Sequence, residues 1–281
     1  MKKIIAVWDH SNTSSKLLKK TNSIAKDLNA SVVLAVFITS LNQKKYNLKN
    51  DTTLTENIKK QVAENFDSSV KVKHIIVVDQ DIAKWINGFC HQTKVDLIIK
   101  TGNRSETLFH TPVDWQLIRQ VNCPILIASA RLWKKNPKIL ATVDVDNKNA
   151  KQKAINSKVL SAAKFVEDMT QSHLHVIYNI GITKALTELD IIEPSEILRK
   201  KGEEANKLLD QCLAKNKIED VTTHIAAGDV AETVPRMAKK LKADLVVMGS
   251  VGRTGMKGML LGNTAERVLH NLRTDVLIIK P

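Results

Sequence analysis

Cysteine is scarce in this chain of 281 residues, and its three positions form no pairing pattern. Cys90, Cys123 and Cys212 are scattered, odd in number and never spaced as Cys-x-x-Cys. This distribution excludes a disulfide scaffold and a zinc finger. We therefore expect buried or incidental thiols in a reducing compartment.

Long apolar runs are also missing, since none approaches the roughly 20 residues that a membrane span needs. The first nine residues carry two lysines and an acid shortly after them, which predicts a strand rather than a signal peptide. Together with the sparse cysteines, these features predict a cytoplasmic protein without a membrane span.

Aromatic residues make up only 4% of a chain whose net charge is +14. A basic chain can attract nucleic acid, anionic lipid or phosphorylated metabolites. Here the lysines occur as dispersed pairs, without interleaved aromatics, zinc-finger spacing or a basic zipper helix. Solvated lysine faces are the favoured interpretation, and nucleic-acid binding is the disfavoured alternative.

Sequence motifs of common enzyme classes are absent as well. The chain contains no GxxxxGK[ST], GxSxG or HExxH sequence and no set of kinase motifs. Residues 255–258 are only a fragment of a P-loop. We therefore predict no catalytic residue, although slow hydrolysis of a bound nucleotide stays compatible with the sequence.

What the chain does contain is an alternation of short apolar runs and segments with helical periodicity. This order predicts βα units around a parallel sheet. The predicted strands are 4–7, 31–37, 72–78, 96–99 and 124–128, and the predicted helices between them are 17–28, 54–66, 81–91 and 114–121.

The same order then begins again after about 140 residues, which indicates a duplicated domain and not a solenoid. Residues 138–144 repeat the pattern of 3–9, and residues 244–248 and 275–279 match 96–100 and 124–128. Between them, the predicted helix 158–169 repeats the first helix, and the predicted strand 173–178 repeats the second strand. We predict domains at 1–131 and 138–281, joined near 131–137.

A glycine-rich stretch separates the predicted strand 243–248 from the predicted helix 265–272. Its glycines are spaced Gly249-x2-Gly252-x9-Gly262, and Asn263 and Glu266 follow with the spacing of a capping box. Glycine lets a backbone approach a ligand, and free N–H groups before a helix suit an anion. The alternative is a flexible loop with an ordinary cap.

With these residues the chain resembles the universal stress protein family, in particular its tandem two-domain members of the E type. The resemblance is carried by the glycine motif, by Asp9 and Asp144 at the ends of the first strands, and by Gly228 after a third strand. It implies two five-stranded parallel sheets of order 3-2-1-4-5 with helices on both faces. It also implies an internal pseudo-dimer of the two repeats, and a homodimer of the whole chain is left open.

The resemblance further implies a nucleotide, ATP or AMP, in the second domain. Asp144 would lie near the ribose or base, with Val176 and Ile177 near the base. The other ligand-binding residues implied are Gly228, Gly249, Gly252, Arg253, Gly262, Asn263 and Thr264. Asn263 replaces the hydroxyl residue that is usual in the motif. Asp144 and Asp146 offer oxygen ligands for Mg²⁺ beside the nucleotide, but a helix cap is the favoured role of Asp146.

The first repeat departs further from the motif. Thr101, Arg104 and Thr111 stand where the second repeat has glycines, and this stretch is three residues shorter. No phosphate cradle is expected there, so the first domain is structural or binds something else. Because that repeat keeps the fold without these glycines, we infer that the fold alone does not require them, which favours a binding role in the second repeat.

Two other features of the sequence have both a functional and a structural interpretation. His173 and His175 share one face of a strand and could bind a metal, but ordinary strand histidines are favoured, and no metal is predicted. Met256 and Met259 make the glycine loop apolar, which suits packing against the other repeat or an acyl tail beside a nucleotide head.

The sequence thus predicts a non-enzymatic stress-response protein that regulates by binding a nucleotide-type ligand in its second domain. The alternatives are an interaction or scaffold protein without nucleotide binding, and a binder of a nucleotide-linked acyl ligand.

Overall fold

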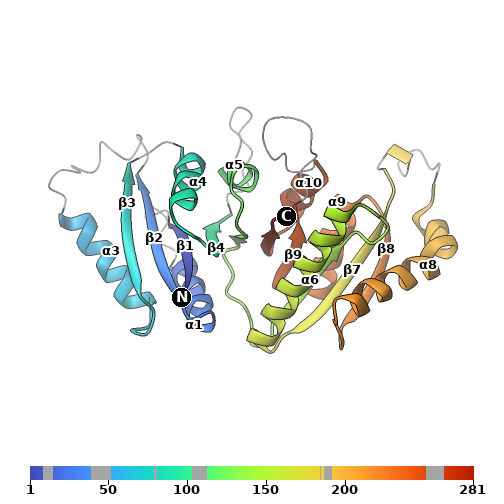
Figure 1. Cartoon of the computed structure of the whole chain (residues 1–281), viewed down its shortest axis with the longest axis horizontal. Coiled ribbons are helices and arrows are strands. Elements are labelled where there is room, and N and C mark those ends of the chain that lie inside the picture. The colour runs from blue at the N-terminus through green and yellow to red at the C-terminus, as the bar shows by residue number, and fades with distance from the viewer. Residues whose placement is uncertain are drawn as a thin grey trace. The chain divides into compact units, whose positions relative to one another are not determined.

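The computed structural model of the chain describes residues 1–8, 15–38, 52–78, 81–102, 113–183, 185–186, 192–250 and 263–281. For Thr52, Asn263 and Thr264 it describes only the backbone. The chain forms two compact units, Met1–Leu132 and Trp133–Pro281, and Figure 1 labels their elements. None of the described helices combines the length and apolar character that a bilayer crossing requires.

The first unit alternates strands and helices, as the apolar pattern predicts. Its strands lie in the order β3-β2-β1-β4-β5, and all of these pairings are parallel. The elements are β1 (Lys2–Trp8), α1 (Lys16–Asp27), β2 (Ala30–Ile38), α3 (Thr52–Asn65), β3 (Val72–Val78), α4 (Ile82–Gln92), β4 (Leu97–Thr101), α5 (Val113–Gln120) and β5 (Ile125–Ala128).

The second unit repeats this plan. Its strands lie in the order β8-β7-β6-β9-β10, again all parallel, so the predicted order 3-2-1-4-5 is confirmed within each unit. The elements are β6 (Lys138–Val143), α6 (Ala150–Thr170), β7 (His173–Gly181), α8 (Pro194–Lys215), β8 (Thr222–Gly228), α9 (Val230–Leu241), β9 (Leu245–Gly249), α10 (Asn263–Asn271) and β10 (Asp275–Ile279).

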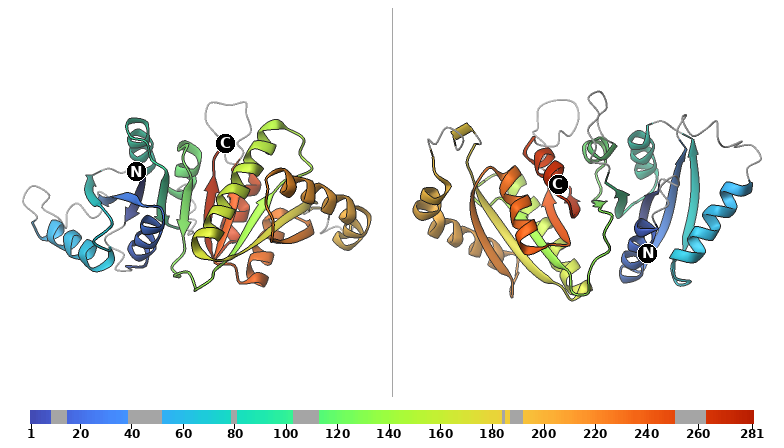
Figure 2. Two further views of the ribbon diagram at one scale, coloured as in Figure 1. Left: turned by 60° about the horizontal axis from the view of Figure 1, so that its bottom comes forward. Right: turned by 180° about the vertical axis from the view of Figure 1, so that it is seen from behind.

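Helices lie on both faces of each sheet, as the views in Figure 2 show. In the second unit the right-handed crossovers place α6 and α8 on one face, while α9 and α10 pack together on the other. The central strands are therefore covered on both sides, and β9 is buried from Leu245 to Met248. This explains why the strands are continuous apolar runs and not alternating ones.

The same aspartate clamp joins the first and fourth strands of each unit. In the first unit the amide of Lys3 donates to Asp96 Oδ2 at 2.7 Å, and the amide of Asp96 donates to the carbonyl of Lys3 at 2.9 Å. In the second unit the amide of Lys138 donates to Asp244 Oδ2 at 3.2 Å, and Asp244 donates back to Lys138 at 2.9 Å. In each unit, two hydrogen bonds at the start of the fourth strand fix its register against the first strand, β4 against β1 and β9 against β6.

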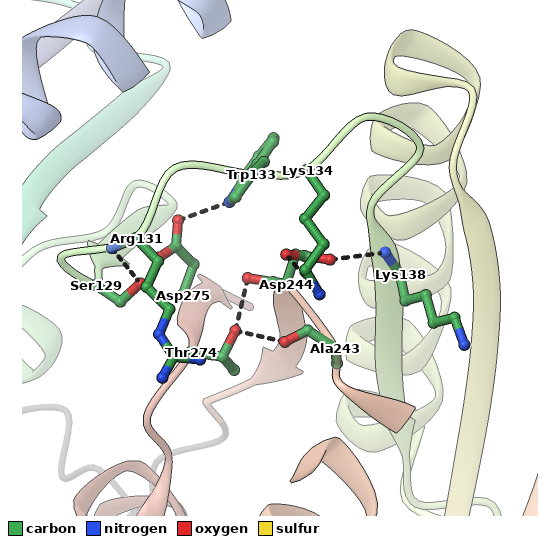
Figure 3. Close-up of polar contacts among 9 residues, drawn as sticks. All are labelled: Ser129, Arg131, Trp133, Lys134, Lys138, Ala243, Asp244, Thr274 and Asp275. Atoms are coloured by element: carbon green, nitrogen blue, oxygen red, sulfur yellow. Dashed lines mark hydrogen bonds and ion pairs between the residues drawn. The ribbon is translucent and has the colours of Figure 1, made fainter. Parts of the chain in front are cut away.

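The start of the second unit is tied to its sheet by the contacts in Figure 3. The indole of Trp133 donates to Asp275 Oδ2 at 2.8 Å. The hydroxyl of Thr274 lies within hydrogen-bonding distance of the carbonyls of Ala243, at 2.9 Å, and Asp244, at 2.6 Å. The residues before β6 are therefore part of the second unit and not a free tether.

Two predicted element ends differ from the structure. The strand predicted to end at Tyr178 continues to Gly181, because Asn179 Nδ2 and the amide of Ile182 both donate to the carbonyl of Gly228 on β8, at 2.9 and 3.0 Å. The capping role predicted for Asp146 is wrong. Helix α6 begins at Ala150, and the side chain of its N-cap, Asn149, accepts from the amide of Lys151 at 2.9 Å.

The backbone conformation at the end of β8 requires a glycine at Gly228. Its φ of +134° is a value that L side chains rarely adopt, and an added Cβ would lie 3.2 Å from Thr233 Oγ1. We expect Gly228→Ala to lower the free energy of unfolding by about 1–3 kcal/mol. Urea unfolding of the purified variant measures this change.

Gly202 supplies the matched control, because it lies within helix α8 and an added Cβ there would meet nothing within 4 Å. Gly202→Ala should raise stability by up to about 1 kcal/mol. Equal effects of the two substitutions would contradict a special backbone requirement at Gly228.

Candidate functional site

A cleft of about 540 Å³ opens at the carboxyl ends of β6, β7 and β9 in the second unit. This volume lies within the range of small-molecule sites, and the carboxyl edge of a parallel sheet is where such sites form. Its polar residues are Thr142, Asp144, Asp146, Asn147, Gln152, Asn156, Tyr178 and Asn179, and its larger apolar residues include Ile155, Val159, Ile177, Val230, Val234, Met248 and Val268.

A buried asparagine holds the turn that presents Asp144. Asn156 Nδ2 donates to the carbonyl of Asp144 at 2.7 Å, and the amide of Asp144 donates to Asn156 Oδ1 at 3.2 Å. Gln152 Nε2 also donates to Asn156 Oδ1, at 3.0 Å. Because Asn156 is only 4% exposed, this network ties the end of β6 to the first turns of α6.

The cleft combines a tyrosine hydroxyl with two carboxyl groups, and burial raises the pKa of Tyr178 and of Asp144. Desolvation raises the pKa of Asp144, hydrogen bonds from Asn147 oppose that shift, and the nearby charge of Asp146 adds to it. Burial, and then the charges of Asp146 and Asp144, raise the pKa of Tyr178 to about 12. At neutral pH the Tyr178 hydroxyl is therefore protonated, while the two carboxylates offer acceptor oxygens.

Gly249 ends β9 directly beneath helix α6. A Cβ at this position would lie 2.6 Å from Ile155 Cγ1 and 3.5 Å from Val159 Cγ2. The packing of α6 therefore requires glycine here whether or not a ligand is bound. The inference from the sequence that the fold itself does not require the glycines is therefore wrong at Gly249.

Helix α10 contributes its N-terminal end to the cleft. Ala265, two residues after the helix begins at Asn263, lines the cleft, as does Val268 one turn later. The first turn of a helix carries amide groups without intrahelical partners and the positive end of the helix dipole. This wall of the cleft therefore suits an anion.

The structure brings together three of the predicted site residues, namely Asp144, Ile177 and Gly249. Val176 is fully buried within β7 and is not among the residues that line the cleft. Gly228 ends the neighbouring strand β8 and binds β7 through its carbonyl. Gly252, Arg253 and Gly262 lie outside the described residues, as do the side chains of Asn263 and Thr264.

Sequence reasoning missed several residues of this cleft, above all Tyr178, Asn179 and Asn156. Asn179 was missed because the predicted strand stopped at Tyr178, one residue before it. Asn156 was missed because the apolar periodicity of α6 becomes clear only later in the helix. The cap signal of Asn149 could have moved the predicted helix start to the observed position.

The first unit places a buried ion pair at the positions equivalent to two cleft residues. Lys100 and Asp114 correspond in the repeat to Met248 and Ala265, and Lys100 Nζ lies 2.8 Å from Asp114 Oδ1. Their side chains are only 11% and 7% exposed. The two repeats therefore share strand order but differ in the chemistry of this edge.

The histidines of β7 and β8 contact one another through their rings. His175 Nδ1 lies 3.1 Å from His224 Nε2 on the next strand, and His173 Nε2 lies 2.8 Å from Thr222 Oγ1. His175 Nε2 is buried without a hydrogen-bond partner among the described residues. Over that same part of the chain, no group of three or more His, Cys, Asp or Glu side chains is placed to hold a metal ion.

The two units define a tandem, doubly wound α/β protein with a small-molecule cleft at one carboxyl edge. A model of the Universal stress protein family matches residues 1–129 and 136–280. The chain therefore belongs to the universal stress protein family, which confirms the resemblance in its sequence.

Similar proteins support this assignment along most of the chain. Universal stress protein E homolog of Haemophilus influenzae is 29% identical over 218 residues, which cover 75% of this chain and 71% of that protein. Universal stress protein E of Escherichia coli K12 is 32% identical over 195 residues, which cover 66% of this chain and 61% of that protein.

A solved structure extends the likeness to the whole chain. A functionally unknown protein of Pseudomonas aeruginosa PAO1 aligns with a TM-score of 0.77 and 27% identity, covering 100% of this chain and 93% of that one. A universal stress protein of Archaeoglobus fulgidus aligns with a TM-score of 0.67 and 18% identity, covering 99% of this chain and 98% of that one. At this identity it supports the fold alone.

The close approach of Gly249 to α6 predicts a packing defect that a second substitution relieves. Gly249→Ala should lower the free energy of unfolding by about 1–3 kcal/mol, because its Cβ would overlap Ile155. Ile155→Ala removes the overlapping atoms and leaves a cavity. The double variant should lose less stability than the sum of the singles, by about 1 kcal/mol in a double-mutant cycle. Strict additivity would contradict the contact.

The histidine contacts predict a stability that depends on pH. Burial, and then the nearby His173, His224 and Lys138, lower the pKa of His175 to about 4 from an ordinary 6.5. Between these values the unfolded chain binds the proton and the folded chain does not, so stability falls as pH falls below 6.5. We expect the free energy of unfolding to be lower by about 1 kcal/mol at pH 5 than at pH 7 through this group.

Urea unfolding of the intact chain across this pH range measures the effect. His175→Asn should flatten the pH dependence, whereas His270→Asn, at an exposed position of α10, should leave it unchanged. An identical slope in the wild type and in His175→Asn would disprove the role of His175.

Proposed function

We propose that the second unit binds a nucleotide-type ligand, ATP, AMP or a metabolite with a nucleotide head, and that the protein acts in the stress response through this binding. The observation that carries the proposal is the cleft at the ends of β6, β7 and β9. It combines a carboxylate, an apolar wall and a helix N-terminus around about 540 Å³. Those three features match the three parts of a nucleotide.

The nucleoside would occupy the inner part of the cleft. Ile177, Val234 and Met248 form an apolar wall for a base, and each is at most 6% exposed. The carboxylate of Asp144 would accept hydrogen bonds from ribose hydroxyls, which is how an acidic residue recognises ribose in other doubly wound sheets. Asn156 would maintain that position by fixing the backbone of Asp144.

The phosphates would lie toward α10, where Ala265 marks the first turn of the helix at the cleft. In this proposal the glycine loop from Gly249 to Gly262 supplies further amide groups, as the family motif implies. Mg²⁺ would fit beside them. Burial, and to a smaller extent the charge of Asp146, raises the pKa of Asp144, and a divalent cation would relieve the repulsion between the two carboxylates with the oxygen ligands that it prefers.

A binding role rather than turnover is supported by the groups around the cleft. Its described lining residues include no histidine, the commonest general base, and no cysteine or lysine nucleophile. In this proposal the protein is regulatory, and ligand binding changes the conformation of the protein or the partner that it binds. A cytoplasmic location is part of the proposal, in keeping with three cysteines that form no disulfide.

Titration calorimetry with ATP and with AMP tests the proposal. The wild type should bind at least one of them, and Asp144→Asn should weaken binding about tenfold, because one charged hydrogen-bond acceptor is lost. Asp9→Asn is the matched control at the equivalent position of the first repeat, and it should leave the affinity unchanged.

Absence of binding to both nucleotides would overturn the proposal and favour a scaffold role. Native mass spectrometry of the freshly purified protein adds an independent measurement. A co-purified nucleotide with an acyl chain would favour the amphiphilic ligand over ATP or AMP.

A further inference from the structure

Two of the three cysteines meet in the first unit. Cys90 lies in the last turn of α4, Cys123 lies between α5 and β5, and their thiols are in hydrogen-bonding contact. Neither is part of a disulfide, and both are of intermediate exposure, so small reagents can approach them. The sequence showed only scattered thiols, because all of β4 and α5 separates this pair along the chain.

The contact follows from the packing of the two helices that cover this part of the sheet. Helices α4 and α5 lie against each other. Both run back from the carboxyl edge of the parallel sheet, so their C-terminal ends lie at the same edge. Cys90 is near the end of α4, and Cys123 follows the end of α5 by three residues. The rest of the fold therefore holds the two sulfur atoms together before any bond is formed.

We propose that Cys90 and Cys123 form a reversible disulfide, which makes the first unit a sensor of oxidised low-molecular-weight thiols. Disulfides in reducing compartments are usually transient and redox-sensing, so a preformed dithiol suits this role. The inference is independent of nucleotide binding, and it assigns a chemical function to the unit in which the glycine motif is degenerate.

The oxidant is a low-molecular-weight disulfide such as glutathione disulfide. The Cys90 thiolate attacks one of its sulfur atoms, a mixed disulfide forms, and one glutathione thiolate leaves. The Cys123 thiolate then attacks the Cys90 sulfur, and the second glutathione thiolate leaves. The protons of the two cysteines end on the two glutathione thiols. Two protein thiols are oxidised, and one disulfide is reduced to two thiols.

The third cysteine provides an internal comparison. Contact with Cys123 lowers the pKa of the Cys90 thiol, whereas burial raises the pKa of Cys212 in the second unit. Thiolate is the attacking species, so Cys90 should react before Cys212 near neutral pH. Cys212 lies on α8 next to Asn216, whose side-chain nitrogen is 3.8 Å from the sulfur.

The test is oxidation of the reduced full-length chain with excess glutathione disulfide, followed by alkylation of the remaining thiols and intact-mass and peptide mass spectrometry. We expect a species that keeps one alkylated thiol, at Cys212, and carries a disulfide-linked peptide pair of Cys90 and Cys123. This species should form at least about tenfold faster than glutathione adds to Cys212. Dithiothreitol should restore all three thiols.

Matched variants make the result specific. Cys212→Ser should form the internal disulfide at the wild-type rate, whereas Cys90→Ser and Cys123→Ser should stop at a mixed disulfide with glutathione. Circular dichroism of each variant checks that it is folded. Stable glutathione adducts on both Cys90 and Cys123 of the wild type, or faster reaction at Cys212, would overturn the proposal.

Discussion

The packing of helix α6 against the ends of β6 and β9 is the contact on which the described cleft depends. Asn156 binds the backbone of Asp144 in both directions, and Ile155 covers a Gly249 that has no room for a Cβ. Adjacent residues of one helix thus hold two strand ends. The cleft lies between those ends because a parallel sheet leaves a crevice where its connections diverge to opposite faces.

The duplication shows which parts of this arrangement belong to the fold. Both units use an aspartate at the start of the fourth strand to clamp the first strand, and both keep the same strand order. At the edge of the cleft they diverge, because Met248 and Ala265 correspond to the buried pair Lys100 and Asp114. A buried ion pair is held only when both charges are satisfied, so this edge of the first unit is committed to an internal contact.

Most of the fold was predictable, because strands buried on both faces leave short continuous apolar runs and the repeat shows each run twice. The site was less predictable. Asp144, Ile177 and Gly249 were found through the resemblance, whereas Tyr178, Asn179 and Asn156 were not. Their positions depend on where β7 ends and α6 begins, and hydrogen bonds to Gly228 and to the Asn149 cap set those ends. Such contacts leave little periodic signal in a sequence.

The sequence by itself determined the duplication and the parallel sheets, because burial on both faces restricts residue type at every strand position, and the family resemblance implied the strand order. Only the tertiary structure decided which side chains face one another. It showed that Gly249 is required by Ile155, that His175 contacts His224, and that Cys90 contacts Cys123. The two residues of each pair come from different parts of the fold, and a sequence pattern does not give the distance between such parts. Helix packing and strand register supply that distance.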